Sequence, residues 1–143
     1  MTEDDSQPII VLDTNVLVSA LLSPFGPPGR LLDLVLIGEI QLALDDRLLA
    51  EYREVLSRPR FRFAPSDVAA LLAFLEREAV HVVAPSLHIK LPDTDDLMFL
   101  EVAHASGAVL VTGNSRHFPE ECRGTVAILS PRDFIEGRFG QQD

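Results

Sequence analysis

The sequence predicts a single α/β domain with a mostly parallel central sheet of about five strands and helices on both faces. Short apolar runs alternate along the chain with longer segments of helical periodicity, which is typical of sheets built from β-α-β crossovers. The 143 residues can bury one hydrophobic core and are too few for two. Apolar residues make up 47% of the chain and charged residues 24%, as in ordinary globular proteins.

The first third of the chain predicts a strand, two helices and a second strand. A continuous apolar run predicts a buried strand over 8–13. A helix over 15–22 should end in a mobile loop at 23–29, because Pro and Gly interrupt helices and this segment holds several of both. We expect a second helix over 30–37 and a strand over 40–44, where apolar residues recur as in a strand.

The middle of the chain predicts two more helices and a short strand. Asp45 or Asp46 should cap a helix that runs to Leu56, because Asp is a preferred residue at helix starts. A second amphipathic helix is expected over 65–78, and a short apolar strand over 81–83.

The last third repeats the alternation of strand and helix. A helix is predicted over 92–106 and should end at Gly107, a residue favoured just past helix ends. Apolar runs predict strands over 108–112 and 126–129, and Pro131 suits the first turn of a terminal helix.

The chain ends should lie outside the fold. We expect one folded domain over 8–138, a disordered acidic segment at 1–7 and a short tail at 139–143. The acidic segment has neither the basic nor the apolar region of a secretory signal, and no apolar run approaches the length of a membrane span. These features predict a cytoplasmic protein that does not bind membranes. The single cysteine, Cys122, excludes an internal disulfide.

The charge balance constrains the substrate. With 12 basic and 22 acidic residues, the formal net charge is −10, which argues against broad affinity for nucleic acid or anionic membranes. Any polyanion must therefore be bound locally. Candidate phosphate contacts crowd one stretch, to which Arg47 could contribute: Arg53, Arg58, Arg60 and Arg62. Equally, Arg53 and Arg58 could pair with Glu54 and its neighbours.

Two carboxylates are placed where an active site could form. Asp13 ends the first strand, and open α/β sheets bind ligands at the carboxyl ends of their strands. A helix cap is the alternative role for Asp13. Glu51 lies on the core-facing side of its predicted helix and so needs a partner. That partner could be Arg47, four residues earlier, or a metal ion.

Further oxygen ligands follow in Asp93-Thr94-Asp95-Asp96 and at Asn114. One of the three acidic residues can cap a helix, and another can favour its positive end. Asp96 should point toward the core, and Asp93 lies one turn before it. Asn114 follows the strand at 108–112 and can either bind a metal through its amide oxygen or form a turn. Oxygen ligands without His or Cys favour Mg²⁺ or Mn²⁺, and such sites commonly hydrolyse phosphodiesters.

These residues, in this order, resemble the PIN-domain family of nucleases, and in particular the VapC-like toxins of prokaryotic toxin-antitoxin systems. The resemblance extends from Val11 to Phe134. Its motifs are Leu12-Asp13-Thr14-Asn15-Val16, Leu49-Ala50-Glu51-Tyr52, Val55-Leu56-Ser57-Arg58-Pro59, Asp93 to Asp96 with Phe99-Leu100, Val111-Thr112-Gly113-Asn114 with His117-Phe118, and Ser130-Pro131.

The resemblance implies a PIN fold and metal-dependent cleavage of single-stranded RNA. Asp13, Glu51 and Asp96 match the three acidic ligands of the family, and Thr14 and Asn15 match its small polar residues beside the metal. A fourth acidic residue is frequent where this chain has Asn114, so Asp93 or water could serve instead. Thr112 and His117 adjoin that position and are candidate substrate contacts. The resemblance also implies a homodimer and a cognate antitoxin whose basic residue enters the acidic pocket.

Three alternative functions remain for comparison. A PIN fold without turnover could be a binding module whose acidic pocket holds a partner's Arg or a structural ion. Asn114, in place of an acidic residue, is the feature that favours this alternative. A haloacid dehalogenase phosphatase usually has a second Asp two residues after the first, where this chain has Asn15. A receiver domain needs a Lys near its end, and Lys90 is elsewhere.

Overall fold

The computed structural model describes residues 7–138. The predicted disordered segment lies outside this range except for Gln7, and the predicted tail at 139–143 lies wholly outside it. Gln7 donates a hydrogen bond from its side-chain amide to the carbonyl oxygen of Gly38. The described chain is therefore anchored just before the first strand.

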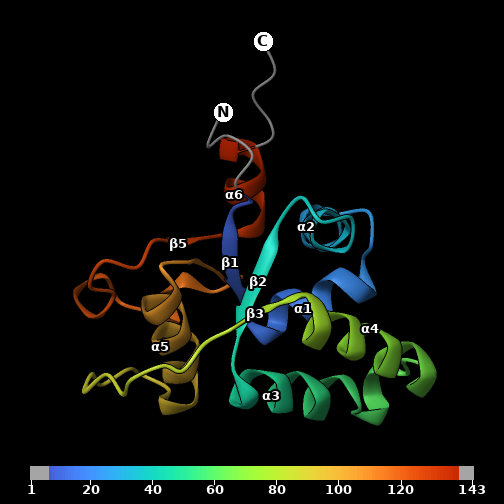
Figure 1. The fold of residues 1–143 in the computed structure, drawn as a ribbon, viewed down its shortest axis with the longest axis horizontal. Helices are drawn as coiled ribbons and strands as arrows, with labels where there is room; N and C mark the ends of the chain where they lie inside the picture. The colour runs from blue at the N-terminus through green and yellow to red at the C-terminus, as the bar shows by residue number, and fades with distance from the viewer. Residues whose placement is uncertain (1–6, 139–143) are drawn as a thin grey trace.

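A parallel sheet forms the centre of the described region, as predicted (Figure 1). The strand order is β3-β2-β1-β4-β5, and each neighbouring pair runs in parallel. In the register, Ile10 lies between Leu42 of β2 and Val109 of β4. The strands are β1 Ile9–Leu12, β2 Gln41–Leu44, β3 Val80–His81, β4 Val109–Val111 and β5 Ile128–Leu129.

Helices cover both faces of this sheet, which confirms the predicted α/β class. Figure 1 shows α5 on one side of the sheet and α1, α2 and α4 on the other, while α3 lies below the carboxyl ends of the strands. Right-handed crossovers require this split, because the chain moves from β1 to β3 in one direction and from β3 to β5 in the other. The helices are α1 Thr14–Leu22, α2 Pro27–Leu36, α3 Asp46–Leu56, α4 Pro65–Glu78, α5 Leu97–Ser106 and α6 Pro131–Arg138.

Three predicted boundaries were wrong. Helix α2 begins at Pro27, inside the predicted loop, because Pro is well suited to a first helical turn, where its missing N–H is not needed. The strand predicted over 81–83 is β3, which ends at His81 at the edge of the sheet. The helix predicted over 92–106 is divided into a 3-10 turn, η3 Thr94–Asp96, and α5.

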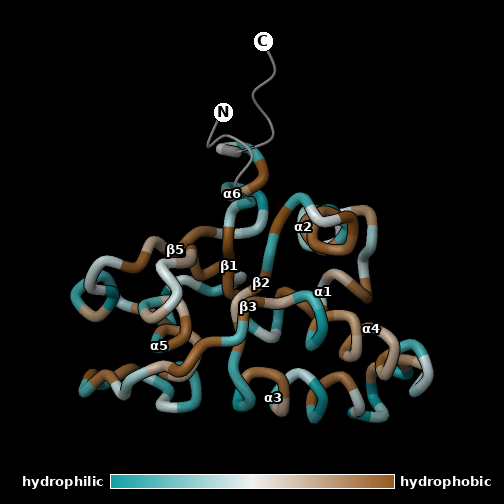
Figure 2. Tube along the Cα trace, in the orientation of Figure 1, coloured by the Kyte–Doolittle hydropathy of each residue, from teal (hydrophilic) through white to brown (hydrophobic). Residues whose placement is uncertain are grey.

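The core lies between the sheet and its two helical layers. Figure 2 shows hydrophobic residues along the strands and in the helices that pack on them. Ile10, Leu44 and Leu110 are fully buried, one on each of three adjacent strands. No helix of the described residues is long and apolar enough to cross a membrane.

The strand order creates a switch point between β1 and β4, where the chain changes its direction of travel across the sheet. Ligands of open α/β sheets bind outside the carboxyl ends of the strands at such points. Asp13 directly follows β1, and its backbone N–H donates to the Val111 carbonyl oxygen at 3.0 Å. Asp13 therefore stands beside the residues that follow β4.

Candidate functional site

Asp13 is a buried carboxylate at the switch point, with only 6% of its surface exposed. At the N-cap position of α1, its carbonyl oxygen accepts from the Val16 N–H at 2.9 Å, but its side chain makes no capping hydrogen bond. Instead, the Thr112 hydroxyl donates to Asp13 Oδ2 at 2.7 Å and accepts from the Asn114 N–H at 3.0 Å. Burial raises the pKa of Asp13, and the Thr112 hydrogen bond, the nearby amides of Thr14 and Asn15 and the charge of His117 partly offset that rise.

Tyr52 fixes the carboxyl end of β1 against α3. Its ring is fully buried, and its hydroxyl donates to the Leu12 carbonyl oxygen at 2.6 Å. Burial, followed by the charge of Asp13, raises the pKa of the Tyr52 hydroxyl, so Tyr52 stays a neutral donor. The sequence analysis gave Tyr52 no role at the site. The only signal was a hydroxyl-bearing ring on an otherwise aliphatic helix face.

Asp96, His117 and Asn114 form a second polar group beside Asp13. His117 Nδ1 lies 3.1 Å from Asp96 Oδ2, and the other ring nitrogen lies 2.9 Å from the Asn114 amide nitrogen. Nδ1 of His117 therefore faces the Asp96 carboxylate, which can accept a hydrogen bond from it, while Nε2 meets the side-chain amide of Asn114. Asn114 thus orients a histidine toward a carboxylate.

The carboxylates of Asp13 and Asp96 are close enough to repel each other. The Asp96 side chain is 13% exposed. Burial raises the pKa of Asp96 to about 6, and the charge of Asp13 adds to the rise while His117 opposes it. Asp93 and Asp95 contribute smaller increases. The site therefore concentrates negative charge that a cation would relieve.

Glu51 faces the same region from α3. It is half-buried, and burial raises its pKa first, followed by the charges of Glu54 and, more weakly, Asp95. The Thr14 hydroxyl lies near enough to lower that pKa slightly. Of the two partners considered for Glu51, Arg47 was wrong, because the Arg47 side chain donates to Asp45 and Glu101 instead.

The other predicted ligands and substrate contacts lie around this centre. Asp93 is exposed, and its Oδ1 accepts from the Asp95 N–H at 2.9 Å, so it caps η3. Asn15 is exposed beside the turn after β4, where a Cβ on Gly113 would lie 3.6 Å from Asn15 Oδ1. The structure thus brings Asn15 to Thr112 and Asn114.

The arginine-rich turn follows α3. Arg58 pairs with Glu54 at 2.7 Å, as one alternative had anticipated. Arg60 lies over the Phe61 ring at 4.8 Å, and Phe61 stacks on Phe63 with 5.6 Å between ring centroids. Arg60 and Arg62 are exposed and have no ion-pair partner within residues 7–137. These two guanidinium groups are available for an anion, as is that of the exposed Arg53, which is in none of the ion pairs of the described residues.

The donor set fits a hard divalent cation that keeps some of its water. No three His, Cys, Asp or Glu side chains in the described part of the chain are grouped tightly enough to enclose an ion. Among the described residues, the buried Thr14 Oγ1 has no hydrogen-bond partner, and Asp96 Oδ2 has only the His117 ring beside it, at 3.1 Å. Mg²⁺ often binds through one or two carboxylates and several waters, so Asp13 and Asp96 could hold it with Glu51 nearby.

Comparisons with known proteins agree with this fold. A family model described as PIN domain matches residues 9–116. An uncharacterized protein of Methanocaldococcus jannaschii is 32% identical over 108 residues, which cover 73% of this chain and 70% of the relative.

Two solved structures share the fold. VapBC2 from Rickettsia felis, bound to a DNA fragment from their promoter, matches with a TM-score of 0.59 at 23% identity over 85% of this chain and 97% of that chain. FitAcB from Neisseria gonorrhoeae matches with a TM-score of 0.56 at 19% identity over 86% of this chain and 98% of that chain.

Fold and site together define an α/β protein with an acidic centre at the sheet's switch point. The chain belongs to the PIN domain family, a family of nucleases that generally use divalent metal ions. This membership confirms the resemblance seen in the sequence.

We predict that Asp96→Asn raises the melting temperature of the metal-free protein. Because folding raises the Asp96 pKa to about 6, the folded state holds its proton more tightly, and stability falls as pH rises from about 4 to about 6. Above that window, removing the charge should stabilise the fold by about 1 kcal/mol, or roughly 3 °C. Thermal unfolding in EDTA at about pH 7.5 and pH 4 measures the difference.

The matched control is Asp133→Asn, which removes an exposed carboxylate on α6. It should leave the melting temperature unchanged at both pH values. An unchanged or lower melting temperature for Asp96→Asn at the higher pH would count against clustered carboxylates.

Proposed function

We propose that this chain is a metal-dependent endoribonuclease that cleaves single-stranded RNA and acts as the toxin of a toxin-antitoxin pair. The observation that carries the proposal is the meeting of Asp13 and Asp96 at the switch point, where two carboxylates shielded from solvent repel each other. Family membership supports the nuclease activity. The VapBC2 and FitAcB structures share the fold and motivate the toxin-antitoxin assignment.

In the proposed reaction, Asp13 and Asp96 hold Mg²⁺ or Mn²⁺, and Glu51 lies across from them. When bound, the ion supplies positive charge that stabilises the phosphoryl oxygens and favours ionisation of water. The Thr112 hydroxyl holds Asp13 in one orientation, and Asn114 does the same for His117. Asn15 and His117 lie at the rim, where they can contact the substrate phosphate. Water adds to phosphorus and loses a proton to solvent, the bond from phosphorus to the ribose oxygen breaks, and that oxygen takes up a proton from solvent.

The Arg60 and Arg62 turn is proposed to bind the RNA backbone. We expect the double variant Arg60→Gln/Arg62→Gln to bind RNA about tenfold more weakly at low salt. The slope of log affinity against log salt concentration should become shallower by roughly one unit. Fluorescence anisotropy with a labelled RNA in EDTA measures binding separately from cleavage. Arg132→Gln on α6 is the control, and equal losses in both proteins would contradict a local contact.

The proposed antitoxin carries a basic segment that enters the acidic site. The chain has a net charge of −10, and at least three of its carboxylates are gathered at the site. Charge complementarity therefore favours a cationic partner over an acidic one. A synthetic Arg-containing peptide should compete with Mn²⁺ for the acidic site, so calorimetry should show weaker Mn²⁺ binding when the peptide is present.

The proposed homodimer is a separate question, and light scattering of the purified chain tests it.

The experiment that tests the function is cleavage of a mixed panel of single-stranded RNAs by the purified chain. Mg²⁺, Mn²⁺ or EDTA is present in parallel reactions. Cleavage with metal and its absence in EDTA would establish the activity, and the cut positions would begin to define the target. No cleavage together with clear Mn²⁺ binding would favour the alternative, a PIN-fold binding module in which Asn114 replaces an acidic residue.

A further inference from the structure

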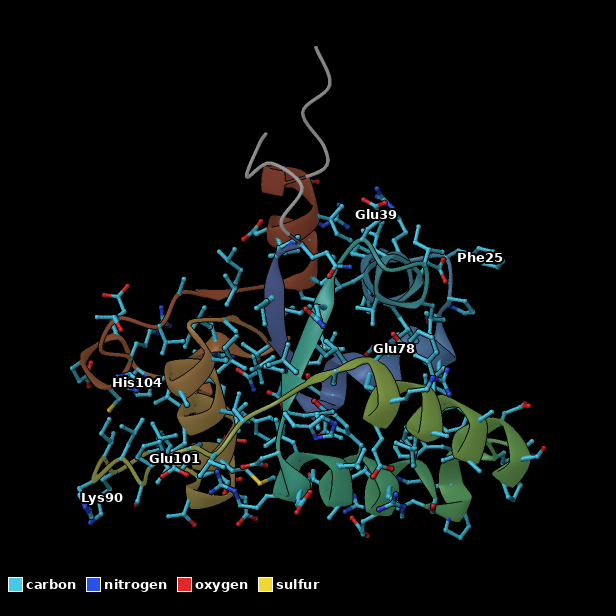
Figure 3. All side chains as sticks on the ribbon, in the orientation of Figure 1. Phe25, Glu39, Glu78, Lys90, Glu101 and His104 are labelled. Atoms are coloured by element: carbon cyan, nitrogen blue, oxygen red, sulfur yellow. The ribbon has the colours of Figure 1, made fainter. Side chains whose placement is uncertain are left out.

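Glu101 is a buried carboxylate that the proposed reaction does not use. It projects from α5 (Figure 3) and has only 4% of its surface exposed. Arg47 Nη1 donates to its Oε1 at 2.7 Å, and the Leu87 N–H donates to its Oε2 at 2.9 Å. A buried carboxylate is costly without such partners. Glu101 therefore ties α5 to α3 and to the irregular segment 82–93.

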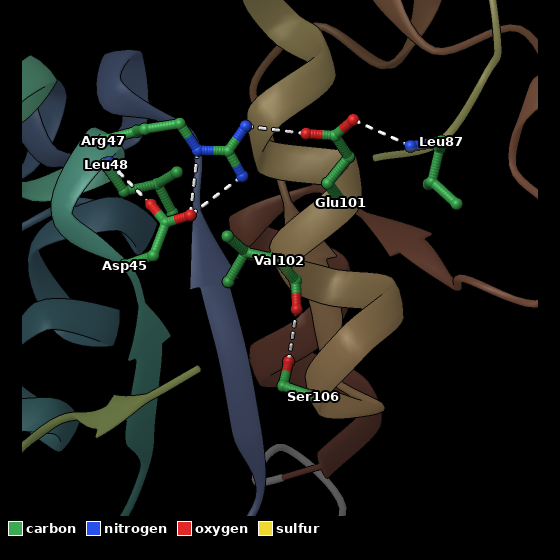
Figure 4. A network of polar contacts seen from close by, with 7 residues as sticks. All are labelled: Asp45, Arg47, Leu48, Leu87, Glu101, Val102 and Ser106. Carbon is green, nitrogen blue, oxygen red and sulfur yellow. Dashed lines mark hydrogen bonds and ion pairs between the residues drawn. The ribbon is translucent and has the colours of Figure 1, made fainter. Parts of the chain in front are cut away.

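Arg47 continues this connection along α3. Its Nε and Nη2 lie 2.9 and 2.8 Å from Asp45 Oδ2, and Asp45 Oδ1 accepts from the Leu48 N–H at 3.1 Å. Figure 4 shows the unbroken chain of contacts from Leu48 to Leu87. The Arg47 guanidinium faces two carboxylates and is thus held in place, although the sequence analysis proposed it as a phosphate contact.

The same pair lines a groove that reaches Glu51, one of the site carboxylates. This groove has a volume of about 520 Å³, and its lining includes Arg47, Glu101, Glu51 and Asp95. Glu51 follows Arg47 by one turn on α3, and Asp96 precedes α5, which carries Glu101. The carboxylates on the two sides repel each other, so the two helices need an attractive contact to stay together here.

We propose that the Arg47–Glu101 pair is a positioning device that sets the distance between α3 and α5, and with it the distance between Glu51 and Asp96. Neither residue contacts the ion or the RNA; both act through the helices that carry the ligands. The effect on metal binding rests on the proposed function, whereas the effect on the helices does not.

The test compares the full-length wild type with Glu101→Gln and with the double variant Arg47→Gln/Glu101→Gln. The double variant removes both charges of the Arg47–Glu101 pair, and Asp45 keeps the Leu48 N–H as its partner, so this variant tests the pair even if Glu101→Gln does not fold. Glu136→Gln, which removes a surface ion pair with Arg132 on α6, is the control. Mn²⁺ binding by calorimetry and amide hydrogen exchange in EDTA are measured for each folded protein.

We expect Mn²⁺ binding to weaken about tenfold in the variants and not in the control, as for other residues that orient metal ligands. Saturating Mn²⁺ should restore the maximal cleavage rate, because the ligands themselves are intact. Exchange of the amides in 82–97 should rise at least about tenfold. Unchanged Mn²⁺ affinity in a folded variant, when the wild type binds Mn²⁺, would overturn the proposal.

The two proposals can fail separately. A wild type that neither binds Mn²⁺ nor cleaves RNA would refute the proposed function, and the exchange comparison alone would then decide the positioning role. Unchanged exchange at 82–97 in the variants would refute that role. A purely structural contribution would lower the melting temperature and leave the Mn²⁺ affinity as in the wild type, and this result would also overturn the proposal.

Discussion

Asp13→Asn should reduce RNA cleavage about 1,000-fold or more while leaving the fold intact. Asp13 is the most deeply buried of the site carboxylates, and it stands at the switch point between β1 and β4. In the proposed site, losing this charge removes a principal ligand of the cation. A 1,000-fold lower rate corresponds to a transition state that is destabilised by about 4 kcal/mol. The Thr112 hydroxyl can still donate to the Asn oxygen, so the local hydrogen bond survives.

The measurement is single-turnover cleavage with Mn²⁺, beside thermal unfolding in EDTA. The control is Asp33→Asn, which changes an exposed carboxylate on α2; it should cleave at the wild-type rate. Burial raises the pKa of Asp13, so the metal-free variant should melt at the same temperature as the wild type or higher. Retained cleavage in Asp13→Asn would refute the site assignment.

The strands were predicted well because burial on both faces leaves a local signature. The apolar runs at β1, β2 and β4 predicted the ends of those strands to within about one or two residues. The edge strand β3 was misplaced, because few contacts constrain its end. The start of α2 was missed because Pro27 and Pro28 were treated as helix breakers, although Pro is accepted in a first turn.

Site residues could be predicted from the sequence only where their position along a strand or a helix fixes the direction of the side chain. Strand ends placed Asp13 and Thr112 together, and helical spacing pointed Asp96 toward the core. Contacts between distant segments were not visible. Arg47 pairs with Glu101, 54 residues away, rather than with Glu51 on its own helix, because the spacing of one helix says nothing of the neighbouring one.

Glu101 carried a weak signal that the sequence analysis did not use. It is the only acidic residue within the apolar helix α5, and an isolated charge among buried residues needs a partner. Identifying Arg47 and the Leu87 amide as those partners required the three-dimensional arrangement of α3, α5 and the segment between β3 and η3.

The largest expected loss of stability comes from Gly29→Ala. Gly29 is buried in α2 against the start of the α1–α2 loop, and a Cβ there would lie 2.0 Å from the Pro24 carbonyl oxygen and 2.3 Å from its carbonyl carbon. Both atoms belong to the backbone, so no side chain can rotate away. Moving the loop or the helix should cost about 3 kcal/mol, or roughly 10 °C in melting temperature.

Gly137→Ala is the matched control, because a Cβ at that helical position meets no atom within 4 Å. It should stabilise α6 by up to about 0.5–1 kcal/mol, since Ala loses less backbone entropy than Gly. Thermal unfolding by circular dichroism compares the two. A melting temperature of Gly29→Ala within about a degree or two of the wild type would contradict the prediction. It would mean that the Pro24 backbone can move away from the new methyl group at little cost in free energy. Cleavage by folded Gly29→Ala well below its melting temperature should match the wild type, because Gly29 contacts none of the site carboxylates.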